Sequence, residues 1–76
     1  MQPTITHAIE DYLKTIYALT AVNQRASTNQ IAEALDVKPA SVTGMIKKLS
    51  QSSPPLVEYQ KHYGVALTPD GEKIAL

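Results

Sequence analysis

Apolar residues recur at intervals of three and four near the start of the chain, which is the pattern of an amphipathic helix. The residues that form this apolar stripe are Ile5, Ile9, Tyr12, Leu13, Ile16 and Tyr17. Thr4 or Thr6 can cap the start, because a threonine hydroxyl accepts a hydrogen bond from a free backbone N–H. The pattern predicts a first helix that runs to about Val22 and is followed by a polar connection.

Two shorter helices are predicted after this connection. Ser27 and Gln30 have the spacing of a capping box, so a second helix begins here and continues through Leu35. Asp36 suits a tight turn, because aspartate tolerates left-handed backbone better than most residues. Pro39 suits the first position of a third helix, where its missing N–H costs no hydrogen bond. The residues predicted to be buried on this third helix are Val42, Met45, Ile46 and Leu49.

A β-hairpin and a fourth helix are predicted in the last third of the chain. A run of serines and prolines ends the third helix, because proline disfavours helical geometry in the residue before it. Leu56–Tyr59 is predicted as a strand, Gln60–Gly64 as a turn and Val65–Leu67 as the returning strand. Thr68 and Pro69 suit the N-cap and the first position of the fourth helix. This order of elements is that of a winged helix-turn-helix, a mainly α fold with a small β-hairpin.

Length and composition indicate a single domain and exclude several classes of protein. A length of 76 residues fits one domain, here residues 1–76. The absence of cysteine excludes disulfides and thiolate metal sites. No apolar run approaches the roughly 20 residues that a membrane helix needs, and the start is not that of a signal peptide. We therefore expect a cytoplasmic protein. No arrangement of nucleophile, histidine and carboxylate is present, so we do not expect an enzyme.

The exposed side of the third helix carries the residues expected to contact DNA. The positions left unburied on it and just before it are Lys38, Pro39, Ala40, Ser41, Thr43, Gly44, Lys47 and Lys48. The small and hydroxylated residues at its start suit contact with base edges, and the lysines further along suit phosphates. Two alternatives stay open. Gly44 either permits close approach to the groove or is merely tolerated, and the lysines either bind phosphates or form a solvated helix face.

The turn of the hairpin is the predicted wing tip. Lys61 and Tyr63 can reach phosphates from it, although an exposed hairpin turn without a partner has the same sequence pattern. His62 gives no reason to infer a metal site. The formal net charge is zero, with seven basic and seven acidic residues, which counts against a strongly charge-driven DNA binder. A winged helix that binds a protein partner is therefore the alternative function.

Four segments carry a resemblance to a known family: Glu10–Tyr17, Ile31–Leu35, Ser41–Thr43 and Leu67–Gly71. They resemble the N-terminal domain of the diphtheria-toxin-repressor family, the iron- and manganese-dependent transcription regulators of bacteria. The resemblance extends from about Ile9 to the end of the chain. It implies a repressor that binds a double-stranded DNA operator as a homodimer when divalent iron or manganese is bound. The family's dimerisation domain and most of its metal ligands follow the winged helix, so this chain is expected to be a fragment of a longer regulator.

The resemblance also implies one metal ligand in this chain. Asp11 stands where the family has a ligand in the first helix, and a carboxylate oxygen suits manganese or ferrous iron. Manganese-type members carry a second carboxylate one turn later, where this chain has Lys14. Within this chain we favour a solvated carboxylate and expect no tightly bound metal. The family's wing often carries an arginine beside its glycine, and that position is Tyr63 here.

Overall fold

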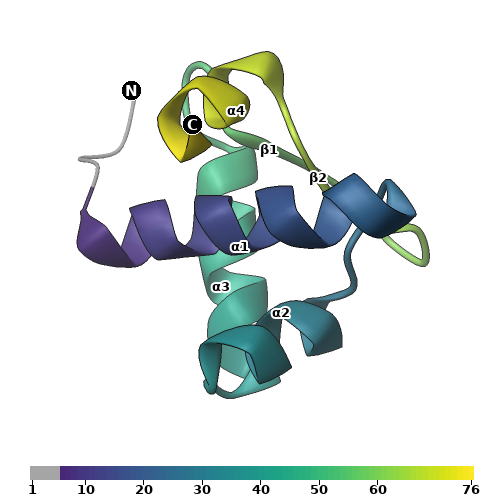
Figure 1. The fold of residues 1–76 in the computed structure, drawn as a ribbon. Coiled ribbons are helices and arrows are strands. Elements are labelled where there is room, and N and C mark those ends of the chain that lie inside the picture. Colours follow the sequence, from purple (N-terminus) through teal and green to yellow (C-terminus); the bar gives the residue numbers. More distant parts are fainter. Residues whose placement is uncertain (1–5) are drawn as a thin grey trace.

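The computed structural model describes residues 6–76 and contains helices and one hairpin in the predicted order (Figure 1). The elements are α1 (His7–Asn23), α2 (Thr28–Leu35), α3 (Pro39–Ser50), β1 (Val57–Gln60), β2 (Gly64–Leu67) and α4 (Pro69–Ala75). The predicted fold class, a mainly helical winged helix-turn-helix, is confirmed. Thr4 and Ile5, which the pattern assigned to the start of the first helix, lie outside the described residues. None of the described helices is long and apolar enough to span a membrane.

The predicted helix starts and the predicted turn are present as local hydrogen bonds and backbone angles. Thr6 caps α1, and its hydroxyl accepts from the N–H of Ile9 at 3.2 Å. The capping box of α2 is complete. The Ser27 hydroxyl accepts from the N–H of Gln30 at 3.0 Å, and the Gln30 side chain accepts from the N–H of Ser27 at 2.9 Å. Asp36 ends α2 in the left-handed region, at φ 56° and ψ 49°.

The core lies where α1 crosses in front of α3 and the hairpin (Figure 1). Helix α1 packs against α2, α4 and β2, while α3 packs against α2 and β1. The largest fully buried side chains are Ile9, Leu13, Ile16, Ile31, Val42, Ile46, Leu49, Leu56, Val57 and Val65. Two residues of the predicted apolar stripes, Tyr17 and Met45, are less buried than expected. Tyr17 is 40% exposed, at the edge of the α1 stripe, and Met45 is half-buried.

The strands of the hairpin differ by one residue from their predicted bounds: β1 lies one residue later at both ends, and β2 begins one residue earlier than predicted. Leu56 is fully buried but precedes β1, and its N–H donates to the carbonyl of Leu49 at 3.0 Å. Gln60 and Gly64, which were predicted as turn residues, instead form the last pair of the antiparallel ladder. The Tyr63 N–H donates to the Gln60 carbonyl at 3.0 Å, which closes a turn of three residues. The five-residue turn was wrong because left-handed backbone at His62 reverses the chain sooner.

The segment between α1 and α2 is hydrogen-bonded to the hairpin through main-chain groups. The Ala26 N–H donates to the Val65 carbonyl at 2.9 Å, and the Val65 N–H donates to the Ala26 carbonyl at 2.8 Å. Gly64, at φ 100°, lies directly against this contact, and a Cβ there would come within 2.7 Å of the Ala26 carbonyl oxygen. The hairpin therefore needs glycine at this position, both for its backbone angle and for the close approach of Ala26.

Candidate nucleic-acid interface

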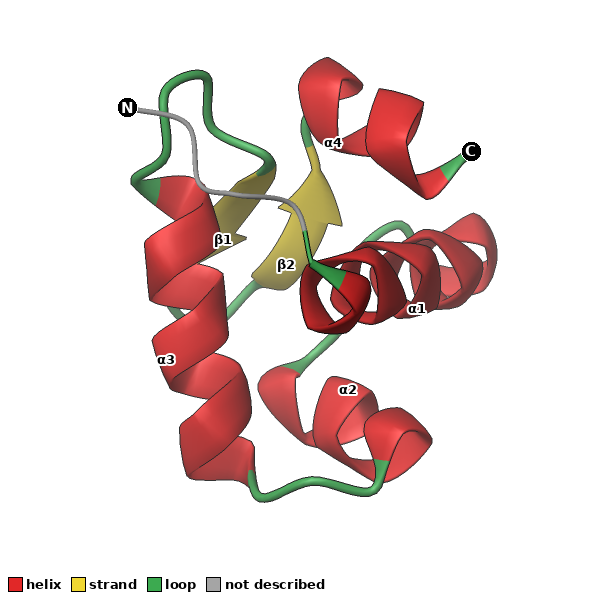
Figure 2. Ribbon diagram, turned by 90° about the vertical axis from the view of Figure 1, so that its left-hand side faces the viewer, coloured by secondary structure: helices red, strands yellow, loops and turns green. Residues whose placement is uncertain are grey.

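Helix α3 runs along one side of the molecule, and α1, α2 and the hairpin lie on its other side (Figure 2). Its apolar residues, including Val42, Ile46 and Leu49, are buried against those elements. The predicted contact residues are exposed: Lys38, Pro39, Ala40, Ser41, Gly44, Lys47 and Lys48. Thr43 differs from them because it is half-buried. The outer side of α3 is therefore free to enter a groove.

The structure adds a hydrogen bond at Thr43 and open space around Gly44 to what the sequence predicted for this side of α3. The Thr43 hydroxyl donates to the carbonyl of Pro39 at 3.2 Å, so in this conformation its oxygen remains as an acceptor. A Cβ added at Gly44 would meet no atom within 4 Å. Packing inside the protein therefore does not require glycine at position 44, although glycine costs about 1 kcal/mol of helix propensity there.

Charge is distributed unevenly even though the net charge is zero. Residues 37–57, which include all of α3, contain Lys38, Lys47 and Lys48 and no acidic residue. The acidic residues lie on α1, on α2 and its C-cap, on β1 and on α4. A neutral chain thus presents three exposed lysines from an acid-free segment, and such lysines can attract phosphates. The acidic residues nearest the start of α3 are Glu33 and Asp36, which border a pocket together with Pro39.

The wing tip is exposed, and its two predicted contact residues are accessible. Lys61 is exposed, and Tyr63 is 72% exposed. His62 lies between them at φ 76°. These side chains are placed to contact a molecule that approaches the hairpin turn.

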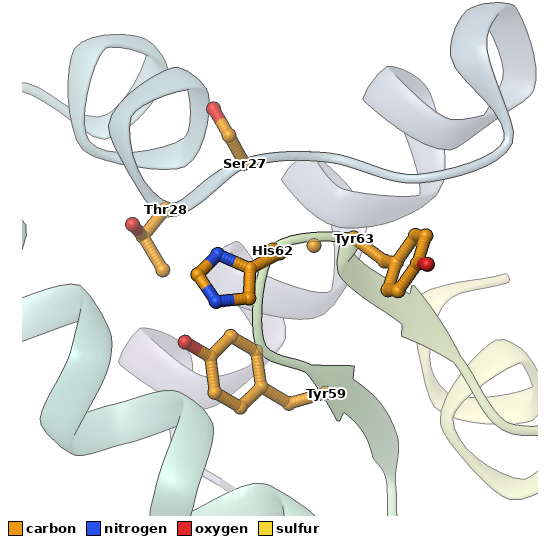
Figure 3. A pocket seen from close by; sticks show the side chains of 6 residues that line it. Ser27, Thr28, Tyr59, His62 and Tyr63 are labelled. Carbon is orange, nitrogen blue, oxygen red and sulfur yellow. The ribbon is translucent and has the colours of Figure 1, made fainter.

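A shallow pocket of about 220 Å³ separates the wing from the start of α2 (Figure 3). Its lining residues are Ser27, Thr28, Tyr59, His62, Tyr63 and Gly64. The His62 ring lies between Thr28 and the Tyr59 ring, and the Tyr63 ring points away from them. The sequence assigned Ser27 to helix capping only and gave Tyr59 and His62 no role. Nothing in the local pattern brings the start of α2 beside the wing, so this grouping appears only in the tertiary structure.

Asp11 does not belong to a group of metal ligands in this structure. It is exposed on α1 and borders a pocket of about 160 Å³ that is otherwise lined by apolar side chains and Tyr12. Within residues 6–76, no three histidine, cysteine, aspartate or glutamate residues lie close enough together to hold a metal ion. The described residues therefore do not fit a complete metal site, and Asp11 can supply only one ligand of such a site.

The fold and the exposed, lysine-bearing helix together define a winged helix-turn-helix DNA-binding domain. The model of the family described as Iron dependent repressor, N-terminal DNA binding domain, matches residues 4–65. Since this match covers most of the chain, the chain belongs to that family. The resemblance recognised in the sequence motifs is thereby confirmed, and DNA binding is supported over the alternatives of an enzyme and a protein-binding winged helix.

Curated relatives agree with this assignment. The chain is 44% identical over 69 residues, which is 91% of its length, to proteins named HTH-type transcriptional regulator MntR. Among them are the proteins of Lysinibacillus sphaericus (strain C3-41), Geobacillus thermodenitrificans (strain NG80-2) and Bacillus pumilus (strain SAFR-032). The match covers 48% of the first two relatives and 46% of the third, so the chain spans about half the length of the relatives it matches.

Proposed function

We propose that this chain is the DNA-reading part of a metal-dependent bacterial transcription regulator, with α3 in the major groove and the wing on the phosphate backbone. The observation that carries the proposal is the outer side of α3, which is exposed and lies in a segment of 21 residues with three lysines and no acid. A helix of this kind enters the major groove in helix-turn-helix proteins, with its first residues at the base edges.

The proposed contacts divide into two kinds. Ala40, Ser41 and Thr43, near the start of α3, contact base edges. The free acceptor of Thr43 fits the amino group of adenine or cytosine, and the methyl group of Ala40 fits a thymine methyl. Lys38, Lys47 and Lys48 bind phosphates, as do Lys61 and Tyr63 at the wing tip. Gly44 has no side chain and Pro39 has a compact ring, so neither keeps α3 from the groove.

The remaining features of the proposed regulator concern a longer protein. We propose that residues 1–76 are one domain of a regulator about twice this length, in line with the lengths of the MntR relatives. In that protein a homodimer would bind an operator, repress transcription in the cytoplasm, and require divalent iron or manganese. Asp11 would supply one carboxylate ligand to the metal, and the other ligands would come from outside residues 6–76.

The direct test is binding of the chain to a fluorescein-labelled duplex, followed by fluorescence anisotropy over a series of salt concentrations. A single DNA-binding domain with zero net charge is expected to bind weakly, with a dissociation constant near the roughly 10⁻⁴–10⁻⁶ M of non-specific binding. The logarithm of the binding constant should fall linearly with the logarithm of salt concentration. A chain that is folded and shows no affinity for duplex DNA at low salt would contradict the proposal.

Lys47 and Thr43 are expected to respond differently to substitution. Lys47→Ala should weaken binding to all sequences alike and reduce the salt slope by about 1, because one phosphate contact is lost. Thr43→Ala should change the preference at one base pair by about 1–3 kcal/mol. Both variants are measured in the full-length regulator, against single-base variants of an operator selected from random duplexes.

Lys14→Ala is the matched control for these measurements. It removes an exposed lysine from α1, outside the proposed interface, so it should leave both the salt slope and the base preference unchanged. A Lys47→Ala variant that alters base preference and keeps the parent salt slope would show that the division of contacts is wrong.

Gly44→Ala separates the two interpretations of this glycine. The added Cβ meets no protein atom, so the variant should gain about 1 kcal/mol of unfolding free energy from helix propensity. If α3 lies deep in the groove, the same methyl group should weaken DNA binding severalfold. Thermal unfolding and duplex anisotropy on the same samples measure the two effects. Unchanged affinity in a stabilised variant would mean that the glycine is merely tolerated.

The chain alone is expected to bind no metal tightly, because Asp11 is the only carboxylate that matches a family ligand. Isothermal titration with manganous ion, and with ferrous ion under anaerobic conditions, should show no binding at micromolar concentrations. Asp11→Ala is the control and should give the same trace. Micromolar affinity in the parent chain that is lost in Asp11→Ala would show that the described residues already assemble a site.

A further inference from the structure

Arg25 precedes α2 and makes contact with both strands of the wing. Its Nη2 donates to Glu58 Oε1 at 2.7 Å, and its Nη1 donates to the Gly64 carbonyl at 3.3 Å. Glu58 belongs to β1 and Gly64 to β2, so a single guanidinium joins the two strands. The Arg25 side chain is 29% exposed and that of Glu58 is 54% exposed, so solvent screens this ion pair only in part.

Arg25 contacts the hairpin close to the pair of backbone hydrogen bonds between Ala26 and Val65. Ala26, the next residue, exchanges two backbone hydrogen bonds with Val65, and Gly64 packs against its carbonyl. The oxygen of Glu58 that accepts from Arg25 also accepts from the Gln60 side chain at 3.2 Å. A two-stranded hairpin is marginally stable by itself, so attachments of this kind add to the burial of Val57 and Val65 in holding it in place.

Resting on the proposed DNA-binding function, we infer that Arg25 is a positioning residue: it holds the wing in the orientation in which the wing tip and α3 contact the same duplex. Two of its five N–H donors are used inside the protein, on Glu58 and on the Gly64 carbonyl. A wing that is already in place loses less conformational freedom on binding than one that moves. Arg25 thus favours DNA binding without touching DNA.

Glu58 distinguishes this role from a direct phosphate contact by Arg25. If Arg25 positions the wing, Glu58→Ala releases the arginine from β1 and weakens DNA binding, although the substitution removes a negative charge from the wing. If Arg25 instead bound a phosphate, the same substitution would free its guanidinium and strengthen binding. The two roles therefore predict changes of opposite sign for one variant.

The experiment measures the affinity of four variants for a labelled DNA duplex by fluorescence anisotropy: Arg25→Ala, Arg25→Lys, Glu58→Ala and the double alanine variant. The measurements are made at several salt concentrations, at a temperature where circular dichroism shows each variant folded. Each single alanine variant should lose about two- to fivefold in affinity, the range of a partly exposed ion pair. The salt slope should not change. The double variant should be no weaker than Arg25→Ala, because both substitutions remove one interaction. Arg25→Lys should also lose affinity, since an ammonium lacks the planar fork that reaches two acceptors.

Lys14→Ala is the control, since it removes one cation from α1 and is expected to leave affinity unchanged. Tighter binding by Glu58→Ala, or a salt slope reduced by about 1 in Arg25→Ala, would identify Arg25 as a phosphate contact and overturn the inference. Affinities equal to that of the parent in all variants would overturn it as well.

Hydrogen exchange without DNA separates this inference from the proposed function. The Val65 N–H, bonded to Ala26, and the Tyr63 N–H, bonded to Gln60, should exchange faster in Arg25→Ala and Glu58→Ala than in Lys14→Ala. If these amides exchange faster and the parent chain binds no duplex, the proposed DNA-binding function fails, and the role of Arg25 in it fails too. If the parent binds duplex and the amides exchange at parent rates, only the role assigned to Arg25 fails.

Discussion

Ile46→Ala is expected to lower the free energy of unfolding by about 2–5 kcal/mol. Ile46 is 1% exposed on the inner side of α3, within the core cluster that joins this helix to the rest of the protein. Removing three carbon atoms from such a position loses apolar burial and leaves a cavity. Because small domains have small stability margins, a loss of this size takes a large share of the total. Urea unfolding followed by circular dichroism measures it.

Val22→Ala is the matched control for the loss of an aliphatic side chain. Val22 is also helical, but it is 80% exposed, so the substitution should change the unfolding free energy by no more than about 0.5 kcal/mol. Comparable effects of the two substitutions would contradict the packing of α3 against the core, and with it the assignment of its opposite side to DNA.

Gly71→Ala is expected to lower the unfolding free energy by about 1–3 kcal/mol, the usual cost of forcing an extra methyl group into a packed site. A Cβ at this position of α4 would overlap the carbonyl oxygen of Leu56 and lie 3.4 Å from a methyl group of Leu67. The same oxygen accepts from the N–H of Thr68, which caps α4, so the main chain of both segments would have to move. Thermal unfolding of the variant measures this cost.

Gly44→Ala is the control, since it makes the same change in another helix where the added methyl group is in open space. Both substitutions gain helix propensity, so the difference between them reports the close approach of α4 to Leu56. Equal stabilisation of the two variants would show that α4 does not approach Leu56 as closely as the structure has it. This contact also accounts for the glycine in the Leu67–Gly71 motif that carried part of the family resemblance.

Much of the fold could be predicted because its signals are local. A hydroxyl at Thr6 or Ser27 caps a helix through residues three positions away, and Asp36 adopts left-handed backbone by itself. The three-and-four spacing of apolar residues likewise defined the buried sides of α1 and α3, and therefore the exposed side of α3. The limits of this reasoning appear at Tyr17, which has the right spacing yet is 40% exposed, because none of the elements described in residues 6–76 covers it completely.

The interface depends more on contacts between distant parts of the chain. The sequence by itself determined the order of elements, the family, and the exposed positions of α3 and the wing tip, with the exception of the half-buried Thr43. Only the tertiary structure decided how the wing is held, because Arg25 and Ala26 reach Glu58, Gly64 and Val65 across more than thirty residues of chain. The pocket that joins the start of α2 to the wing arises in the same way. Periodicity and capping describe neighbours within one element, whereas side-chain hydrogen bonds between elements depend on how the whole chain packs.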